Sequence, residues 1–140
     1  MRLTVDQHAE VRRRANRLCE YCGWPDWFSP DPFAIDHIYP ASRGGSDGLE
    51  NRAYCCGGCN GAKYDSIEAP DPTTGQLAPL FHPRQDRWDD HFTWNADQTE
   101  LIGITPTGRA TIARLRLNRE EVIRLRRVLP LLPRPTNLGG

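Results

Sequence analysis

The sequence of 140 residues predicts a small α+β fold that a bound metal ion helps to hold together. Stretches with the apolar pattern of strands and stretches with the pattern of helices occupy separate places, and no internal repeat links them. With 12 Gly and 12 Pro, the chain is rich in loops and buries a limited core. Two Cys-x-x-Cys pairs, Cys19/Cys22 and Cys56/Cys59, are the expected metal ligands.

The first expected unit covers residues 1–66. Thr4 and Gln7 have the spacing of a capping box, which predicts a helix that begins there and ends near Leu18. The segments expected to follow are a Pro-rich loop at 23–32, a short strand at 33–38, a Gly- and Ser-rich loop at 40–48, a second short strand at 51–55 and a helix that starts at 60 and runs to 66.

The second expected unit covers residues 67–132, and residues 133–140 are expected to form a disordered tail. Residues 70–75 predict a turn-rich break between elements. The elements expected after it are a hairpin with strands at 91–95 and 100–105, turned at 96–99, and helices at 107–115 and 119–129.

The last of these helices has the clearest sequence pattern. Asn118 is its expected N-cap, with Glu121 in the first turn, where the helix dipole favours an acidic side chain. Pro130 is expected to end the helix. Its apolar face is predicted to hold Val122, Leu125, Val128, Leu129 and Leu132, and its arginines Arg124, Arg126 and Arg127 are predicted to lie mostly off that face.

The four paired cysteines predict one structural zinc site. Zn²⁺ takes four thiolate or imidazole ligands in a tetrahedron, and two Cys-x-x-Cys turns complete such a shell. Cys55 lies beside the second pair but lacks its spacing, so we leave it out of the site. The alternative is two separate buried or redox-active dithiols; two matched pairs are more typical of zinc.

Charge is distributed unevenly along a chain whose formal net charge is zero. Residues 1–20 carry five basic and three acidic side chains, residues 21–100 carry five and thirteen, and residues 101–140 carry eight and two. Lys63 is the only lysine among the 18 cationic residues, and the rest are arginines, which bind phosphate oxygens bidentately. An anionic polymer is therefore a candidate partner, and a solvated surface with internal ion pairs is the alternative.

The location expected for the protein is the cytoplasm. No apolar run approaches the roughly 20 residues of a membrane span. The first residues lack the apolar core of a signal peptide. In the cytoplasm thiols stay reduced, which agrees with the cysteines as metal ligands rather than disulfides.

Four ordered pieces of the first unit share one set of motifs: CEYCG at 19–23, IDHIYPASRGG at 35–45, LENR at 49–52 and CGGCNGAK at 56–63. Together they resemble the HNH endonuclease family over about a third of the chain. The resemblance implies a ββα-metal core, in which two short antiparallel strands, a long loop and a helix surround a divalent ion. Zinc-containing members of the family place this core between two cysteine pairs, as here.

The resemblance also implies roles for individual residues. His37 would be the general base that takes a proton from the attacking water. Asp36 would ligate the catalytic metal, because hard divalent ions prefer carboxylate oxygen. Asn51 would fix the loop between the strands and help to hold His37. Taken one at a time, each of these residues also has an ordinary structural explanation at a strand end or a turn.

Asn60 stands at the last motif position, which makes this chain an H-N-N variant. The resemblance implies that Asn60 is the second protein ligand of the catalytic ion, and an amide oxygen suits Mg²⁺. The alternative for Asn60 is a helix cap. Lys63 and Arg43 are the candidate contacts to the phosphates of nucleic acid.

The activity implied is metal-dependent hydrolysis of phosphodiester bonds in DNA by an enzyme with structural Zn²⁺ and catalytic Mg²⁺ or another divalent ion. One alternative is a zinc ribbon that binds nucleic acid without cutting it. Another is a ribonuclease or toxin that uses the same residues. A monomer is the simplest expectation for the oligomeric state.

Overall fold

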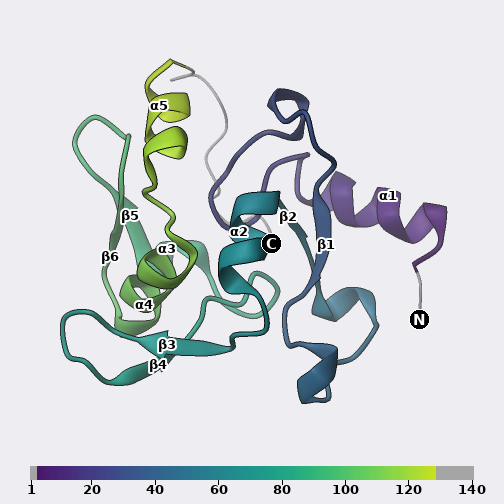
Figure 1. The fold of residues 1–140 in the computed structure, drawn as a ribbon, viewed down its shortest axis with the longest axis horizontal. Helices are drawn as coiled ribbons and strands as arrows, with labels where there is room; N and C mark the ends of the chain where they lie inside the picture. Colours follow the sequence, from purple (N-terminus) through teal and green to yellow (C-terminus); the bar gives the residue numbers. More distant parts are fainter. Residues whose placement is uncertain (1–2, 129–140) are drawn as a thin grey trace.

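The computed structural model describes residues 3–128 and has a mixed α+β fold, as predicted (Figure 1). Its helices are α1 (Val5–Arg14), α2 (Gly57–Lys63), α3 (Trp88–His91), α4 (Pro106–Leu115) and α5 (Glu120–Val128). Its strands are β1 (Ala34–His37), β2 (Arg52–Cys55), β3 (Glu68–Pro70), β4 (Leu77–Pro79), β5 (Phe92–Trp94) and β6 (Leu101–Gly103). They pair as three two-stranded antiparallel sheets, β1 with β2, β3 with β4 and β5 with β6.

Helix α1 begins at the predicted capping box but ends early. The Thr4 hydroxyl accepts a hydrogen bond from the Gln7 backbone N–H at 3.1 Å, and the Gln7 side chain accepts from the Thr4 N–H at 2.9 Å. The helix stops at Arg14, so the predicted end near Leu18 is wrong. Asn16 and Arg17 have φ of 55° and 60°, a left-handed conformation that cannot continue a right-handed helix.

Strands β1 and β2 form at the two predicted places and set the position of the motif residues. Their register pairs Asp36 with Ala53 and His37 with Arg52. Both motif residues therefore stand at the end of β1, where the chain enters the long loop that leads to β2. Asn51 lies just before β2, in a single 3₁₀ turn.

Helix α2 starts three residues earlier than predicted. Its N-cap is Cys56, whose Sγ accepts a hydrogen bond from the Cys59 N–H at 3.5 Å. The helix ends at Lys63, not at Ser66. A cysteine is not a typical cap, so the sequence carries no ordinary signal for this start.

The C-terminal segment contains the predicted β5–β6 hairpin and helix α4, together with elements that were not predicted. Helix α4 has Thr105 as its N-cap, whose side chain accepts from the Gly108 N–H at 3.0 Å. The break at 70–75 is the turn of an additional hairpin, β3–β4. A single helical turn, α3, precedes β5.

Helix α5 is present, but two predictions about it are wrong. Asn118 does not cap it; its side chain accepts from the Leu101 N–H at 2.8 Å and donates to the Leu101 carbonyl at 2.9 Å. Arg126 is buried, because its guanidinium donates to backbone carbonyls from other parts of the chain. The predictions for Leu129, Pro130, Leu132 and the tail at 133–140 lie outside the described residues.

One apolar core connects the two expected units. It extends from Val11 of α1 through the cysteines and β2 to Leu115 and Val122 of the C-terminal segment. Figure 1 shows α2 between the β1–β2 sheet and helix α4. The division of the chain near residue 66 stays a prediction. None of the helices between residues 3 and 128 has the length and apolar character of a membrane span.

Candidate functional site

The four paired cysteines converge on one point. Their Sγ atoms all lie within 4.8 Å of one another, and all four residues are buried. The Sγ atoms of Cys22 and Cys56 are 3.6 Å apart. A tetrahedral zinc shell with Zn–S bonds of about 2.3 Å has sulfur–sulfur distances of roughly 3.8 Å. The donor set therefore fits structural zinc better than two separate dithiols, and it is the one such cluster found between residues 3 and 128.

Two similar turns place the sulfurs. In each turn the second cysteine's backbone N–H donates to the first cysteine's Sγ at 3.5 Å, for Cys22 to Cys19 and for Cys59 to Cys56. Such N–H donors stabilise thiolate charge. Cys55 is also buried, but its Sγ donates to the Cys56 carbonyl at 3.5 Å and is not a member of the cluster.

The His37 imidazole is held on both sides. Its Nε2 lies 2.9 Å from Oδ1 of Asp47, and its Nδ1 lies 3.3 Å from Nη1 of Arg52. A guanidinium can only donate, so Nδ1 is the acceptor and the ring proton sits on Nε2, facing Asp47. In this arrangement Nδ1 carries a lone pair, and the Asp47 carboxylate accepts the hydrogen bond of Nε2.

Asp47 was not predicted as a site residue. A single aspartate in a Gly- and Ser-rich loop has no spacing that marks it, and only the folded loop brings it to His37. The hydrogen bond from His37 is the largest cause that lowers the pKa of Asp47 below its ordinary value, and the charge of Arg52 acts in the same direction. Asp47 is therefore a carboxylate at neutral pH.

Asp36 is buried, with a relative exposure of 7%. Its Oδ2 accepts a hydrogen bond from the Tyr21 hydroxyl at 3.1 Å and pairs with Nζ of Lys63 at 3.1 Å. Burial raises the pKa of Asp36, and the Lys63 charge opposes that shift. Both contacts use Oδ2, so among residues 3–128 the Oδ1 atom has no hydrogen-bond partner.

Lys63 is 1% exposed, and its ammonium points inward. Besides Asp36 it donates to the carbonyls of His37 at 3.2 Å and Ile38 at 3.1 Å. The phosphate contact expected of Lys63 stays a prediction; in this arrangement the ammonium holds the end of β1.

Asn51 ties the loop after β1 to the start of β2. Its Oδ1 accepts from the Tyr39 N–H at 2.8 Å, and its Nδ2 donates to the carbonyls of Tyr39 at 2.8 Å and Ser46 at 2.7 Å. All the polar atoms of the amide are therefore engaged with backbone. The site residue is buried, with 6% exposure.

Asn60 lies inside α2, one position after Cys59. The capping alternative is excluded, because Cys56 occupies the N-cap. The Asn60 side chain is half-buried and makes no hydrogen bond with any residue of the described part of the chain. Its amide oxygen is thus available as a ligand.

Arg43 lies at the surface near the end of α2. It is the last residue of a 3₁₀ turn, Ala41–Arg43, and its Nε donates to the Asp65 carbonyl at 3.0 Å. The contact anchors the side chain while the residue remains exposed.

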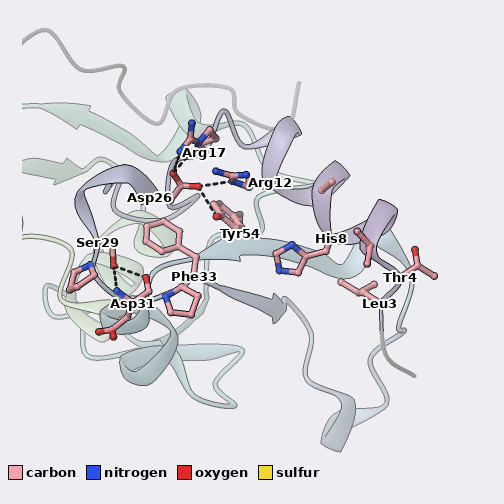
Figure 2. A pocket seen from close by; sticks show the side chains of 14 residues that line it. Leu3, Thr4, His8, Arg12, Arg17, Asp26, Ser29, Asp31, Phe33 and Tyr54 are labelled. Atoms are coloured by element: carbon pink, nitrogen blue, oxygen red, sulfur yellow. Dashed lines mark hydrogen bonds and ion pairs between the residues drawn. The ribbon is translucent and has the colours of Figure 1, made fainter.

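A cleft of about 640 Å³ opens elsewhere, between α1 and the loop at 29–33. Figure 2 shows Arg12, Arg17 and Tyr54 converging on the Asp26 carboxylate beside this cleft, at 2.8, 3.0 and 2.7 Å. Both arginines are thereby paired with this one carboxylate, and none of the motif residues at the end of β1 lines the cleft. We assign it no ligand.

The model of the HNH endonuclease family matches residues 19–66. No curated protein and no solved structure matches the chain. The matched segment begins at Cys19 and contains both cysteine pairs. It also includes Asp36 and His37 at the end of β1. The resemblance of the motifs is confirmed: residues 19–66 match the model of the HNH endonuclease family, and both cysteine pairs of the cluster that fits zinc lie within the match.

Proposed function

We propose that this protein is a metal-dependent endonuclease that hydrolyses phosphodiester bonds in DNA, with His37 as its general base. The observation that carries the proposal is the His37 imidazole at the end of β1, backed by the Asp47 carboxylate and adjacent to Asp36. A histidine held in one tautomer by a carboxylate is a recurring arrangement for proton transfer.

The proton transfer follows from the hydrogen bonds of the ring. Because the Nε2–H is bonded to Asp47, Nδ1 carries the free lone pair of the ring. Nδ1 is therefore the atom that accepts a proton from water. The contact from Arg52 to Nδ1 is long, at 3.3 Å, so a water molecule can replace it. Asp47 then stabilises the imidazolium that forms. Arg52 keeps its contacts to the Asp47 carbonyl at 3.3 Å and to the Asp47 carboxylate at 3.5 Å.

The catalytic ion is assigned to Oδ1 of Asp36 and the amide oxygen of Asn60. Both are hard oxygen donors, which suits Mg²⁺ completed by water and phosphate oxygens. When bound, such an ion neutralises the scissile phosphate and stabilises the leaving oxygen. Lys63 has a positioning role, because its ion pair on Oδ2 fixes the carboxylate while Oδ1 makes no hydrogen bond with residues 3–128.

The nucleic-acid contact is assigned to Arg43 rather than Lys63. Arg43 is exposed at the end of α2, and its guanidinium suits a phosphate of the backbone. We further propose a cytoplasmic location, because none of the five cysteines forms a disulfide bond. We also propose a monomer as the active form.

Nicking of supercoiled plasmid with Mg²⁺, Mn²⁺ or Ni²⁺ tests the proposal. His37→Ala should lower the nicking rate by roughly 10²–10⁴-fold, because it removes the base. His8→Ala, which changes a histidine remote from the motif, is the control. Full activity of His37→Ala would exclude the assigned base. Binding without cleavage under every metal would favour a zinc ribbon, and faster cleavage of RNA in a parallel digest would favour a ribonuclease.

A further inference from the structure

Arg119, in the link between α4 and α5, lies against the cysteine cluster. Its Nη2 is 3.4 Å from Sγ of Cys56 and 3.9 Å from Sγ of Cys22, and its Nη1 is 3.6 Å from Sγ of Cys59. Three of the four sulfurs thus face one guanidinium. Figure 1 shows this link passing beside α2, which carries Cys59. The side chain is 7% exposed.

The Arg119 guanidinium also makes contacts with α4 and α5. Its Nη1 donates to the carbonyls of Leu115 at 3.4 Å and Arg116 at 3.2 Å, at the C-terminal end of α4. Its Nε pairs with the exposed Glu121 at 3.1 Å. A helix C-terminus favours a cation, so α4 presents the charge to the sulfurs.

Four thiolates around Zn²⁺ would carry a net charge of −2, and the four cysteines that would hold the ion are buried. A buried charge is costly unless another charge or hydrogen-bond donors compensate it. Arg119 supplies one positive charge and N–H donors directed at the sulfurs. Such partners beside the ligands of a metal commonly decide how tightly it is held.

Gly58 makes the approach possible. A Cβ at this position would lie 2.7 Å from Nη2 of Arg119, whereas a Cβ on the neighbouring Gly57 would meet nothing within 4 Å. The absence of a side chain at Gly58 therefore leaves the space that the guanidinium occupies.

We propose that Arg119 is a charge-compensating partner of the zinc site, through which the C-terminal segment slows loss of the metal. The proposal concerns this segment outside the matched residues 19–66 and does not depend on cleavage of DNA. It requires a positive planar group at Arg119 and an open space at Gly58.

Release of zinc from the full chain to a chromophoric chelator tests the role of the charge. Arg119→Gln should release zinc roughly 10–100-fold faster than the native chain, the range typical of such partners. Arg119→Lys, which keeps the charge but loses the planar fork, should fall between the two. Arg124→Gln removes an exposed charge paired with Glu120 and should behave as the native chain. An Arg119→Gln chain that keeps its helical circular dichroism and native release rate would overturn the proposal.

A second pair of variants covers the case in which Arg119→Gln fails to fold. Gly58→Ala displaces the guanidinium without changing any charge, and Gly57→Ala is the matched control on the same helix turn. Both changes replace glycine by alanine in the first turn of α2, so a general effect on the helix does not explain a difference between them. Faster zinc release from Gly58→Ala alone supports the proposal; equal release from both overturns it.

Discussion

Lys63 is a buried lysine on a short helix, an environment that the sequence did not predict. Its ammonium is buried against Asp36 and against the carbonyls at the end of β1. A buried ion pair is weak evidence for net stability, but loss of one partner leaves an uncompensated charge. The ion pair between Lys63 and Asp36 therefore serves mainly to hold in place the Asp36 carboxylate, which we assign to the metal.

Lys63→Met should lower the free energy of unfolding by roughly 3–5 kcal/mol, because it leaves Asp36 buried without its partner. The double change Lys63→Met with Asp36→Asn should recover part of that loss, since no charge then remains. Urea denaturation measures both, with Arg87→Met at an exposed position as the control. Equal losses in the single and double variants would contradict the coupling.

Asp47→Asn tests the carboxylate behind His37. The amide keeps the size of the side chain but cannot stabilise an imidazolium, so the variant should lose part of the roughly 10²–10⁴-fold that the base contributes. The measurement is the rate of plasmid nicking across pH. Asp31→Asn, on an exposed loop remote from His37, should leave the rate unchanged. An unaltered rate and pH profile in Asp47→Asn would exclude the positioning role.

At the scale of elements, the unpredicted β3–β4 hairpin is held by a side chain from helix α4, Arg109. Asp71 in its turn is fully buried and accepts from Thr73 and Thr74, while Arg109 of α4 donates to both carboxylate oxygens at 2.9 and 2.8 Å. The hydrogen bonds from Arg109, with those from the turn, lower the pKa of Asp71 to about 2.

This pKa gives a stability prediction with a definite sign. Because the folded-state pKa lies below the ordinary value of 3.8, Asp71 contributes stability above about pH 4, and that contribution is lost as the pH falls toward 2. Asp71→Asn should lower the melting temperature at neutral pH, on the order of 5 °C, and the drop between pH 4 and 2 should be smaller in the variant. The acid titration of melting temperature measures this. A drop as large as in the native chain would show that other carboxylates account for it.

Local patterns in the sequence predicted the elements whose signals are local. The capping box at Thr4, the β5–β6 hairpin and helix α4 all rest on residues close in sequence. The errors in predicting helix ends and caps occur where a residue distant in sequence determines the local structure. Asn118 has the sequence of a cap but pairs with Leu101 across the fold, and α2 starts early because a metal-site cysteine caps it.

The same limit applies to the candidate site. Motif spacing predicted the cysteine cluster, which the structure confirms, and named His37 and Asp36 as candidates, whose roles stay predictions. Asp47 and Arg119 carry no such pattern, because only the folded loop and the docked helices bring them to their partners. Burial of Lys63 could not be predicted either, since a lone lysine on a short helix is usually solvated.

At the scale of the whole molecule, arginines of the C-terminal segment reach the first cysteine turn. Arg84 pairs with the buried Glu20, and Arg126 donates to the Cys22 carbonyl at 3.1 Å. Arg126 also donates to the carbonyls of Thr99 and Leu117, so one side chain joins three separate parts of the backbone. The two segments are thus connected by directional contacts in addition to their common core.

Removal of zinc should therefore affect the whole chain and not the cysteine turns alone. A strong chelator should lower helical circular dichroism and expose the five cysteines to a thiol reagent, because a structural site contributes its binding energy to folding. Zn²⁺ should restore the signal, and Mg²⁺, which prefers oxygen ligands, should not. Unchanged dichroism after complete removal of zinc would show that the core alone sustains the fold.

The burial of Lys63 has a practical consequence for measurement. It is the chain's single lysine and is 1% exposed, so an amine-directed acylating reagent has, besides the amino terminus, one target that the native fold conceals. Acylation followed by peptide mass spectrometry then reports how often the β1–α2 contact opens, through the group added at Lys63 rather than the one added at the amino terminus. The only lysine of the sequence is thus a probe for the integrity of the candidate active site.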